Sequence, residues 1–259
     1  MSLAPDRCFV VFALARTGSR TLSRLLQCHV DIRCLYEPFN PRLHEGRYAR
    51  QATDRHGLDR AMEEIWRTYN GVKHVWDPTG WPFLDKGGLN EQLLAEGKHR
   101  ILLLTRRNRL RRLVSLHISL QSDVWFIWDE PTRRKFEEFQ FRPIDRALFG
   151  AQLEIEAQVV ARHKQLAADC GKPFLDCHYE DIFGLDRSVD AKLGRLQEIL
   201  AFLGFTQITD PAALDRARSL LDPKLGTFNS EQIYRRIPGI ERIEEEFGSD
   251  EIGWLFDRA

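Results

Sequence analysis

The chain has 259 residues, of which 43% are hydrophobic and 29% charged, a composition typical of a globular protein with a substantial core. Its 38 basic and 38 acidic residues cancel, which disfavours a protein that coats nucleic acid, because such proteins are usually basic overall. The five cysteines are odd in number and lack C-x-x-C spacing, so we expect neither a zinc nor a disulfide framework, and a reducing compartment.

No apolar run approaches the ~20 residues that a membrane helix needs. The N-terminal run CFVVFALA ends in Ala13-Leu14-Ala15, which is similar to a signal-peptidase site, but Asp6 and Arg7 precede it and the run is short. Its β-branched and aromatic residues favour a buried strand that leads directly into a loop. We therefore expect a cytoplasmic protein that does not associate with a membrane.

Apolar runs and helical patterns alternate along the chain. Strands are predicted at residues 8–14, 32–35, 71–75, 100–105 and 173–178. Helices are predicted at residues 19–30, 58–69, 89–95, 108–120, 147–168, 191–202 and 212–220. This alternation predicts an α/β fold in a single domain, with a mostly parallel sheet covered by helices on both faces, a helical insertion near 120–170 and an irregular segment over 221–259. Ligands of such sheets bind beyond the carboxyl ends of the strands.

The junction FALARTGSRTLSRLL joins the first strand to the first helix. The turn is Arg16-Thr17-Gly18-Ser19, in which Ser19 is a suitable N-cap and Gly18 lets the backbone approach a ligand closely. Backbone N–H groups and the helix dipole at such a junction bind anions, Arg16 adds a guanidinium, and Thr17 and Thr21 add hydroxyls. A tight turn with a solvated arginine is the alternative, and the loop by itself does not decide between them.

A second basic element, RRNRLRRLVS, follows the apolar strand RILLLT. Ser115 is seven positions after Asn108, which is close to two helical turns, so both lie on one face of the predicted helix. The long side chain of Arg107 can fold along that face. Arg107 and Ser115 are therefore predicted to grip one phosphate, through charge-assisted hydrogen bonds and a hydroxyl.

Two alternatives apply to this basic helix. The segment from Arg106 to Arg112 is also consistent with nucleic-acid binding, although the neutral chain argues against it. A solvated basic face is the other interpretation, and we expect it for Arg109, Arg111 and Arg112.

Four motifs in order, RTGSRTL, RRNRLRRLVS, YEDIF and LAFLGF, resemble those of sulfotransferases that use 3′-phosphoadenosine 5′-phosphosulfate (PAPS). The resemblance extends over about residues 9–205 and is closest to bacterial carbohydrate enzymes such as trehalose and nodulation-factor sulfotransferases. It implies a P-loop-like fold, PAPS as co-substrate with no metal, and a small-molecule hydroxyl acceptor, a carbohydrate or another metabolite, with no nucleic-acid partner. Members of this family often dimerise, so a homodimer is also expected.

The resemblance implies roles for individual residues in donor binding. The loop contacts to the donor would come from Arg16, which meets the 5′-phosphate, and from Thr17, Gly18, Ser19, Arg20 and Thr21. Arg107 and Ser115, eight positions later, would bind the 3′-phosphate, and Tyr179 would lie near the nucleoside. The tryptophan and the C-terminal Arg-Lys-Gly segment of many cytosolic members are missing, which leaves the adenine contacts open.

Three residues are candidates for the chemistry of transfer. Glu37, in CLYEPFNP after the second strand, is the first candidate for the base that takes the acceptor proton, with a solvent-exposed carboxylate as its alternative. Lys73, in GVKHVW, resembles the family lysine that neutralises the bridging oxygen as it leaves. His74 points to the opposite side of the strand from Lys73, so it is a second candidate base, with a structural histidine as its alternative.

Two other functions are consistent with parts of the sequence. A P-loop kinase would use the same strand–turn–helix junction, but the Gly-Lys ending of its phosphate loop is missing. A non-catalytic binder of nucleotide or nucleic acid would use the helix from Arg106 to Arg112, and the neutral charge and Glu37 count against it. A magnesium requirement would identify the kinase, and steep salt-dependent binding would identify the nucleic-acid binder.

Overall fold

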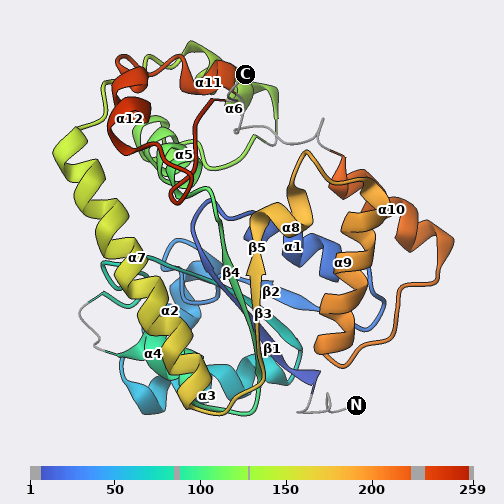
Figure 1. The fold of residues 1–259 in the computed structure, drawn as a ribbon. Helices are drawn as coiled ribbons and strands as arrows, with labels where there is room; N and C mark the ends of the chain where they lie inside the picture. Colours follow the sequence, from blue (N-terminus) through green and yellow to red (C-terminus); the bar gives the residue numbers. More distant parts are fainter. Residues whose placement is uncertain (1–6, 85–87, 128, 223–230, 257–259) are drawn as a thin grey trace. The chain divides into compact units, whose positions relative to one another are not determined.

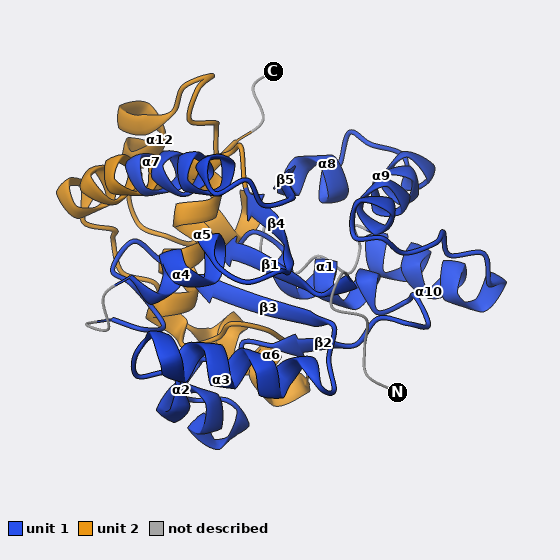
Figure 2. Ribbon diagram, turned by 90° about the horizontal axis from the view of Figure 1, so that it is seen from below, with its two compact units in different colours: residues 1–105, 158–222 blue, residues 106–157, 223–259 orange. Residues whose placement is uncertain are grey.

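The computed structural model describes residues 7–84, 88–127, 129–222 and 231–256 (Figure 1). It separates into two compact units, residues 1–105 with 158–222 and residues 106–157 with 223–259 (Figure 2). The two units are described separately below, and the single domain expected from the sequence stays a prediction. The chain leaves the first unit after its fourth strand and re-enters it within one long helix, α7 (Arg146–Asp169).

The first unit is built on one five-stranded sheet in the order β2-β3-β1-β4-β5, and every pairing in it is parallel. Its strands are β1 (Phe9–Leu14), β2 (Cys34–Tyr36), β3 (Gly71–Trp76), β4 (Arg100–Thr105) and β5 (Phe174–His178). The run FVVFAL is buried at every position of β1, because that strand lies in the middle of the sheet. The predicted α/β class is confirmed.

Helices cover both faces of this sheet (Figure 1). One face is covered by α1 (Ser19–Leu26), α8 (Tyr179–Phe183), α9 (Val189–Phe202) and α10 (Pro211–Leu221). The other is covered by α2 (Arg47–Gln51), α3 (Arg55–Trp66), α4 (Leu89–Ala95) and the second half of α7, with a short 3-10 turn, η2 (His44–Gly46), preceding α2. Alternation along β1 sends Val11 and Ala13 to the α1 face and Val10 and Phe12 to the α3 face.

The direction in which the chain crosses the sheet reverses at β1. Strands β2 and β3 lie on one side of β1, whereas β4 and β5 lie on the other. In open α/β sheets the ligand crevice lies outside the carboxyl ends of the strands at such a reversal. Residues 15–18 leave β1 at this point, and because all strands are parallel the segments that follow β2 and β3 emerge at the same edge.

The second unit is helical in its described part. It contains α5 (Arg109–Ser122), α6 (Glu130–Glu138), the first half of α7, α11 (Glu231–Tyr234) and α12 (Ile240–Phe247). Apolar side chains of these helices, including Leu110, Phe149, Tyr234 and Ile240, form a separate core. The irregular segment expected over residues 221–259 is corrected, because α11 and α12 lie within it; its residues 223–230 and 257–259 lie outside the described residues.

The first predicted helix is too long by one turn. It ends at Leu26 because the next N–H groups form tighter bonds, from Cys28 to the Leu25 carbonyl and from His29 to the Leu26 carbonyl, both at 3.0 Å. The Gln27 amide then turns to β2, donating to the Tyr36 hydroxyl at 2.8 Å. Over the ranges that the structure describes, no helix is both long and apolar enough to cross a membrane.

Candidate active site

The turn after β1 uses backbone conformations that few residues adopt. Gly18 is the N-cap of α1 with φ of 78°, and Arg16 also has a positive φ, 69°. Thr17 is fully buried and its hydroxyl donates to the Leu14 carbonyl at 2.7 Å, which fastens the turn to the strand end. The prediction that Ser19 is the N-cap is wrong, because Ser19 is the first helical residue and Gly18 is the N-cap.

The amino end of α1 is arranged to attract an anion. Its cap residue has no side chain to accept a hydrogen bond, and its first turn contains no acidic residue. The N–H groups of a first turn have no intrahelical acceptor, and the helix dipole places partial positive charge there. Arg20 and Thr21, both expected to contact the donor, lie in this turn and are half-buried. A phosphate or sulfate group therefore fits this turn chemically.

Tyr179 and Phe183 of α8 pack against Gly18. A Cβ placed on Gly18 would lie 2.8 Å from Phe183 Cε2 and 3.0 Å from Tyr179 Cδ2, which leaves room for glycine alone. The two ring centroids are 5.1 Å apart. The structure thus places Tyr179, named by the sequence motif YEDIF, beside the glycine turn after β1.

Glu37 and Lys73 form an ion pair where β2 ends beside β3. Lys73 Nζ donates to Glu37 Oε1 at 2.5 Å, and the Glu37 backbone N–H donates to the Lys73 carbonyl at 2.7 Å. Asn40 Nδ2 donates to Glu37 Oε2 at 2.9 Å, so both carboxylate oxygens are held. The sequence indicated Glu37 and Lys73 separately; it predicted neither their contact nor Asn40, for which no spacing signal exists.

The Glu37 carboxyl is ionised at neutral pH in spite of its burial. Burial by itself raises the pKa, but Lys73 and the hydrogen bonds from Lys73 and Asn40 outweigh it, so the pKa of Glu37 lies below the usual value. The Glu37 side chain is 19% exposed and that of Lys73 is 3% exposed. The carboxylate therefore reaches the surface, whereas the ammonium is enclosed.

Lys73 lies on the sheet face that α1 covers. Its strand neighbours in the register are Val11 on β1 and Tyr36 on β2, and Val11 belongs to the α1-side core. Its Nζ is 5.7 Å from the centre of the Tyr36 ring, whose hydroxyl is bound by Gln27 at the end of α1. The Lys73 ammonium and the glycine turn after β1 are thus on the same side of the sheet.

His74 faces the other side of the sheet, as strand alternation predicts. It is 1% exposed, stacks on Phe83 with ring centroids 5.6 Å apart, and its Nε2 lies 2.7 Å from Asn90 Oδ1. Because an amide oxygen only accepts, Nε2 carries the proton and donates it. Burial lowers the pKa of His74 to about 4, so the ring is neutral at physiological pH. These contacts favour the structural interpretation of His74 over the base.

Arg107 and Ser115, expected to bind the 3′-phosphate, belong to the second unit. Arg107 is exposed and lies just before α5, whereas Ser115 is fully buried in its second turn. Asn108 caps this helix, because its Oδ1 accepts from the Arg111 backbone N–H at 2.8 Å. The helix therefore begins one residue later than predicted, and Arg107 stands in the segment that leads into it.

The three arginines expected to form a solvated basic face are engaged within the second unit. Arg112 is 3% exposed and pairs with Glu156 of α7, which corrects the expectation for this residue. Arg111 Nε donates to a C-terminal backbone carbonyl at 3.0 Å, and Arg109 lies 3.6 Å from the Glu251 carboxylate. This helix consequently offers fewer cations to a nucleic acid than its sequence indicates.

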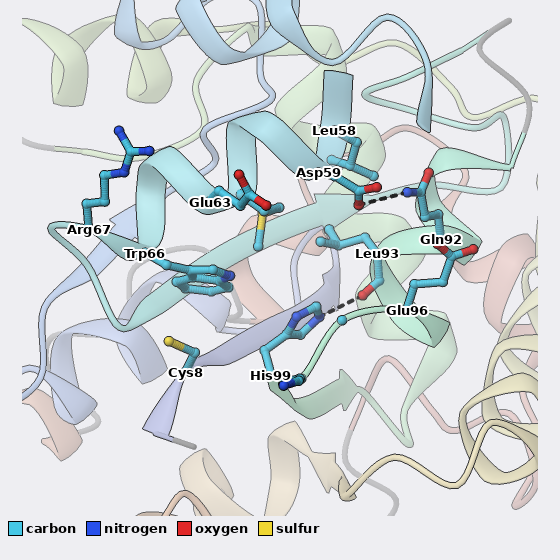
Figure 3. A pocket seen from close by; sticks show the side chains of 13 residues that line it. Cys8, Leu58, Asp59, Glu63, Trp66, Arg67, Gln92, Leu93, Glu96 and His99 are labelled. Atoms are coloured by element: carbon cyan, nitrogen blue, oxygen red, sulfur yellow. Dashed lines mark hydrogen bonds between the residues drawn. The ribbon is translucent and has the colours of Figure 1, made fainter. Parts of the chain in front are cut away.

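A cavity of about 520 Å³ lies in the first unit, and none of these candidate residues lines it (Figure 3). It is lined by Cys8 before β1, by α3 and α4, and by His99 before β4. Two hydrogen bonds lie within this lining: Gln92 Nε2 donates to Asp59 Oδ1 at 3.0 Å, and His99 Nε2 donates to the Leu93 carbonyl at 2.8 Å. It lies at the amino ends of the strands, opposite the edge where such sheets bind ligands, so we assign it no role in the activity.

Comparison with known proteins leaves the function open. No family model matches the chain, and no curated protein matches it. Among solved structures, mouse sulfotransferase SULT7A1 complexed with PAP is similar over 90% of this chain and 68% of that chain, with 14% identity and a TM-score of 0.44. The functional assignment therefore rests on the chain's own residues.

Proposed function

We propose that this protein is a sulfotransferase that moves the sulfuryl group of PAPS to a hydroxyl of a small acceptor. The observation that carries the proposal is the Glu37–Lys73 ion pair, on the same side of the sheet as the glycine turn after β1. In-line transfer of such a group requires an anion site for the donor, a cation for the leaving oxygen and a base for the acceptor proton. The turn, Lys73 and Glu37 have the chemistry for these three tasks.

The turn after β1 fits the donor's 5′-phosphosulfate. PAPS supplies a sulfuryl group that is already activated, so a loop led by Arg16 needs no lysine for a metal-chelated γ-phosphate. Gly18 brings backbone close to the ligand, and Tyr179 stands beside it for the nucleoside. We assign the 3′-phosphate to Arg107 and Ser115, which is supported by their spacing in RRNRLRRLVS.

Lys73 and Glu37 are coupled in the proposed reaction. As the bond from sulfur to the bridging oxygen breaks and the bond to the acceptor oxygen forms, Lys73 donates to the bridging oxygen, which becomes negative. Glu37 then loses part of its counter-charge, and burial raises its proton affinity. It therefore takes the acceptor proton at the stage when that proton becomes acidic.

The acceptor in this proposal is a carbohydrate or another small hydroxyl-bearing metabolite. The support is the resemblance of the motifs, including SLHISLQSDVW after the arginine segment, to those of bacterial carbohydrate sulfotransferases. The proposed enzyme needs no metal and has no nucleic-acid partner. We also propose that it is a homodimer in the cytoplasm, because members of the family that it resembles often dimerise.

Calorimetry tests the donor assignment directly. Adenosine 3′,5′-bisphosphate (PAP) should bind without magnesium and far more tightly than ADP or AMP. Arg107→Ala should weaken the binding of PAP but not that of AMP. The matched control Arg109→Ala, whose partner Glu251 is exposed, should change the affinity for neither nucleotide. Equal affinity for the three nucleotides would reject the proposal, and binding that requires magnesium would indicate the kinase alternative.

A further inference from the structure

We propose that His74, acting through Asn90, holds residues 77–84, the turn after β3, against the loop that carries Glu37, and so positions the acceptor side of the site. His74 is in this view a positioning residue. The coupling of the two loops is read from contacts within the first unit; only its consequence for turnover rests on the proposed function.

The hydrogen bonds run in one direction from the strand to the turn. His74 Nε2 donates to Asn90 Oδ1 at 2.7 Å, which fixes the orientation of the Asn90 amide. Asn90 Nδ2 then donates to the carbonyls of Gly80 and Trp81, at 3.1 and 3.2 Å. Asn90 is 7% exposed, so these bonds are shielded from water. A neutral imidazole on β3 thereby determines where two peptide groups of the turn lie.

Aromatic rings join this turn to the Glu37 loop. Phe39, two positions after Glu37, packs on Phe83 of the turn with ring centroids 5.2 Å apart. His74 contacts both rings, with centroids 6.0 Å from Phe39 and 5.6 Å from Phe83. The imidazole therefore lies at the junction of two loops that leave the sheet at the same edge.

The turn itself carries groups suited to a polar acceptor. Asp77 Oδ1 accepts from the Thr79 N–H at 2.8 Å, the Thr79 hydroxyl at 2.6 Å and the Trp81 N–H at 3.3 Å, which folds the turn on itself. Thr79 is exposed, and Asp77 and Trp81 are partly exposed. Since β2 and β3 are adjacent and parallel, this turn leaves the sheet at the same edge as the loop that carries Glu37.

The protonation state of His74 is compatible with donation from Nε2. Two titratable side chains act on it electrostatically, Glu37 from the loop after β2 and His163 from α7. Burial lowers the pKa of His74 to about 4 and also lowers that of His163. The imidazole is therefore a fixed hydrogen-bond donor over the physiological range of pH.

Two substitutions of His74 separate positioning from base catalysis. Glutamine places an amide N–H near the position of Nε2 and can donate to Asn90, but it cannot act as a base. Leucine removes the donor. The Trp81 environment is followed by ¹⁹F NMR of protein labelled with 5-fluorotryptophan, with the Trp81 signal among the six tryptophans assigned by Trp81→Phe. His99→Leu, which removes another buried histidine bonded to a carbonyl in the same unit, is the matched control.

We expect His74→Gln to keep the Trp81 resonance in place, and His74→Leu and Asn90→Leu to shift or broaden it, while His99→Leu leaves it unchanged. PAP affinity should be unaffected in every variant. PAP release from PAPS is measured with trehalose as acceptor, or with water if trehalose adds no rate. His74→Gln should stay within about threefold of the wild type, and His74→Leu should lose about tenfold, as expected for a misplaced substrate-binding wall.

Two results would overturn the inference. An unmoved Trp81 resonance in both leucine variants would show that His74 does not hold the turn. A loss of about 10²–10⁴-fold in His74→Gln, with the Trp81 resonance unchanged, would identify His74 as the base. Absence of PAP binding by the wild-type protein would instead reject the proposed function, and the resonance would still decide the loop coupling.

Discussion

Replacing Lys73 with methionine removes the ammonium while keeping a side chain of similar length. Glu37 is then left largely buried without its counter-charge, since the two side chains are 3% and 19% exposed and 2.5 Å apart. Removing one partner of a buried pair typically costs about 3–5 kcal/mol of stability, and the partial exposure of Glu37 places this case near the lower value. A loss of about 3 kcal/mol corresponds to a melting temperature lower by about 6–12 °C for a chain of this size.

The pH dependence of the loss gives its cause. In the wild type the pKa of Glu37 is lowered, so its contribution is present above the usual glutamate value of 4.5 and is lost as pH falls through the lowered pKa. In Lys73→Met the hydrogen bond from Asn40 remains, but burial, the largest contribution, outweighs it and raises that pKa. The part of the deficit that comes from this raised pKa is present at neutral pH and is gone by about pH 4.5, whereas the part that comes from the lost ion pair disappears only as pH falls through the lowered wild-type pKa. The double variant Lys73→Met/Glu37→Gln should recover about 1–2 kcal/mol, because no buried charge is left.

Urea unfolding followed by tryptophan fluorescence, at neutral pH and near pH 4.5, measures these differences. The matched control is Lys164→Met, because Lys164 Nζ lies 2.6 Å from Asp176 Oδ2 but the two side chains are 35% and 32% exposed. That change should cost only about 0.2–1 kcal/mol. The reasoning is refuted if Lys73→Met costs no more than the control, or if adding Glu37→Gln restores nothing.

Three further changes test other parts of the structure. Gly18→Ala should lower the stability measured by thermal unfolding by about 1–3 kcal/mol and weaken the binding of PAP in calorimetry. The reason is that the new Cβ would stand on a backbone with φ of 78° and lie 2.8 Å from Phe183. An unchanged affinity for PAP would count against the turn as the anion site. Arg112→Met should cost about 3–5 kcal/mol at neutral pH, because it leaves Glu156, whose pKa burial already raises, without its partner. That loss should shrink as pH falls towards the ordinary glutamate value, and adding Glu156→Gln should relieve it; a loss independent of pH would point to packing instead. The pKa of His74 is about 4 in the folded protein and 6.5 for an ordinary histidine, so the folded state loses stability as pH falls from 6.5 to 4. His74→Gln should therefore reduce the slope of the unfolding free energy against pH in this range by up to about 1.4 kcal/mol per pH unit. An unchanged slope would contradict the assigned protonation.

The sheet was predictable because each of its strands corresponds to a local pattern of apolar residues in the sequence. The apolar run of β1 needs burial on both faces, and the short apolar runs that became β3, β4 and β5 alternate with helical patterns. The boundaries of β4 and α4 coincide with the predicted ones. The cap of α1 was not predictable by residue type, because Ser19 is the better N-cap residue in general but Gly18 alone fits under Tyr179 and Phe183.

The contact between Glu37 and Lys73 in the candidate site could not be predicted, because it depends on strand register. Glu37 and Lys73 are 36 residues apart, and only the pairing of Tyr36 with Lys73 brings them together. No local periodicity encodes that pairing. The same holds for Asn90, which reaches His74 only because α4 packs on the face of the sheet opposite α1. The residue types indicated the chemistry, whereas the topology determined which of them meet.

The spacing of polar residues in α5 indicates which of its arginines is buried. Arg112, Ser115, Ser119 and Ser122 recur at intervals of three, four and three residues, and all are buried in α5. Small hydroxyl side chains at helical spacing behind an arginine indicate a second packed face, in addition to the apolar one that includes Leu113. Arg112 therefore points inward to a carboxylate 44 residues away, while Arg107, before the helix, is exposed and suited to an external anion. Position on the helix, and not the arginine itself, separates the structural cation from the candidate binding residue.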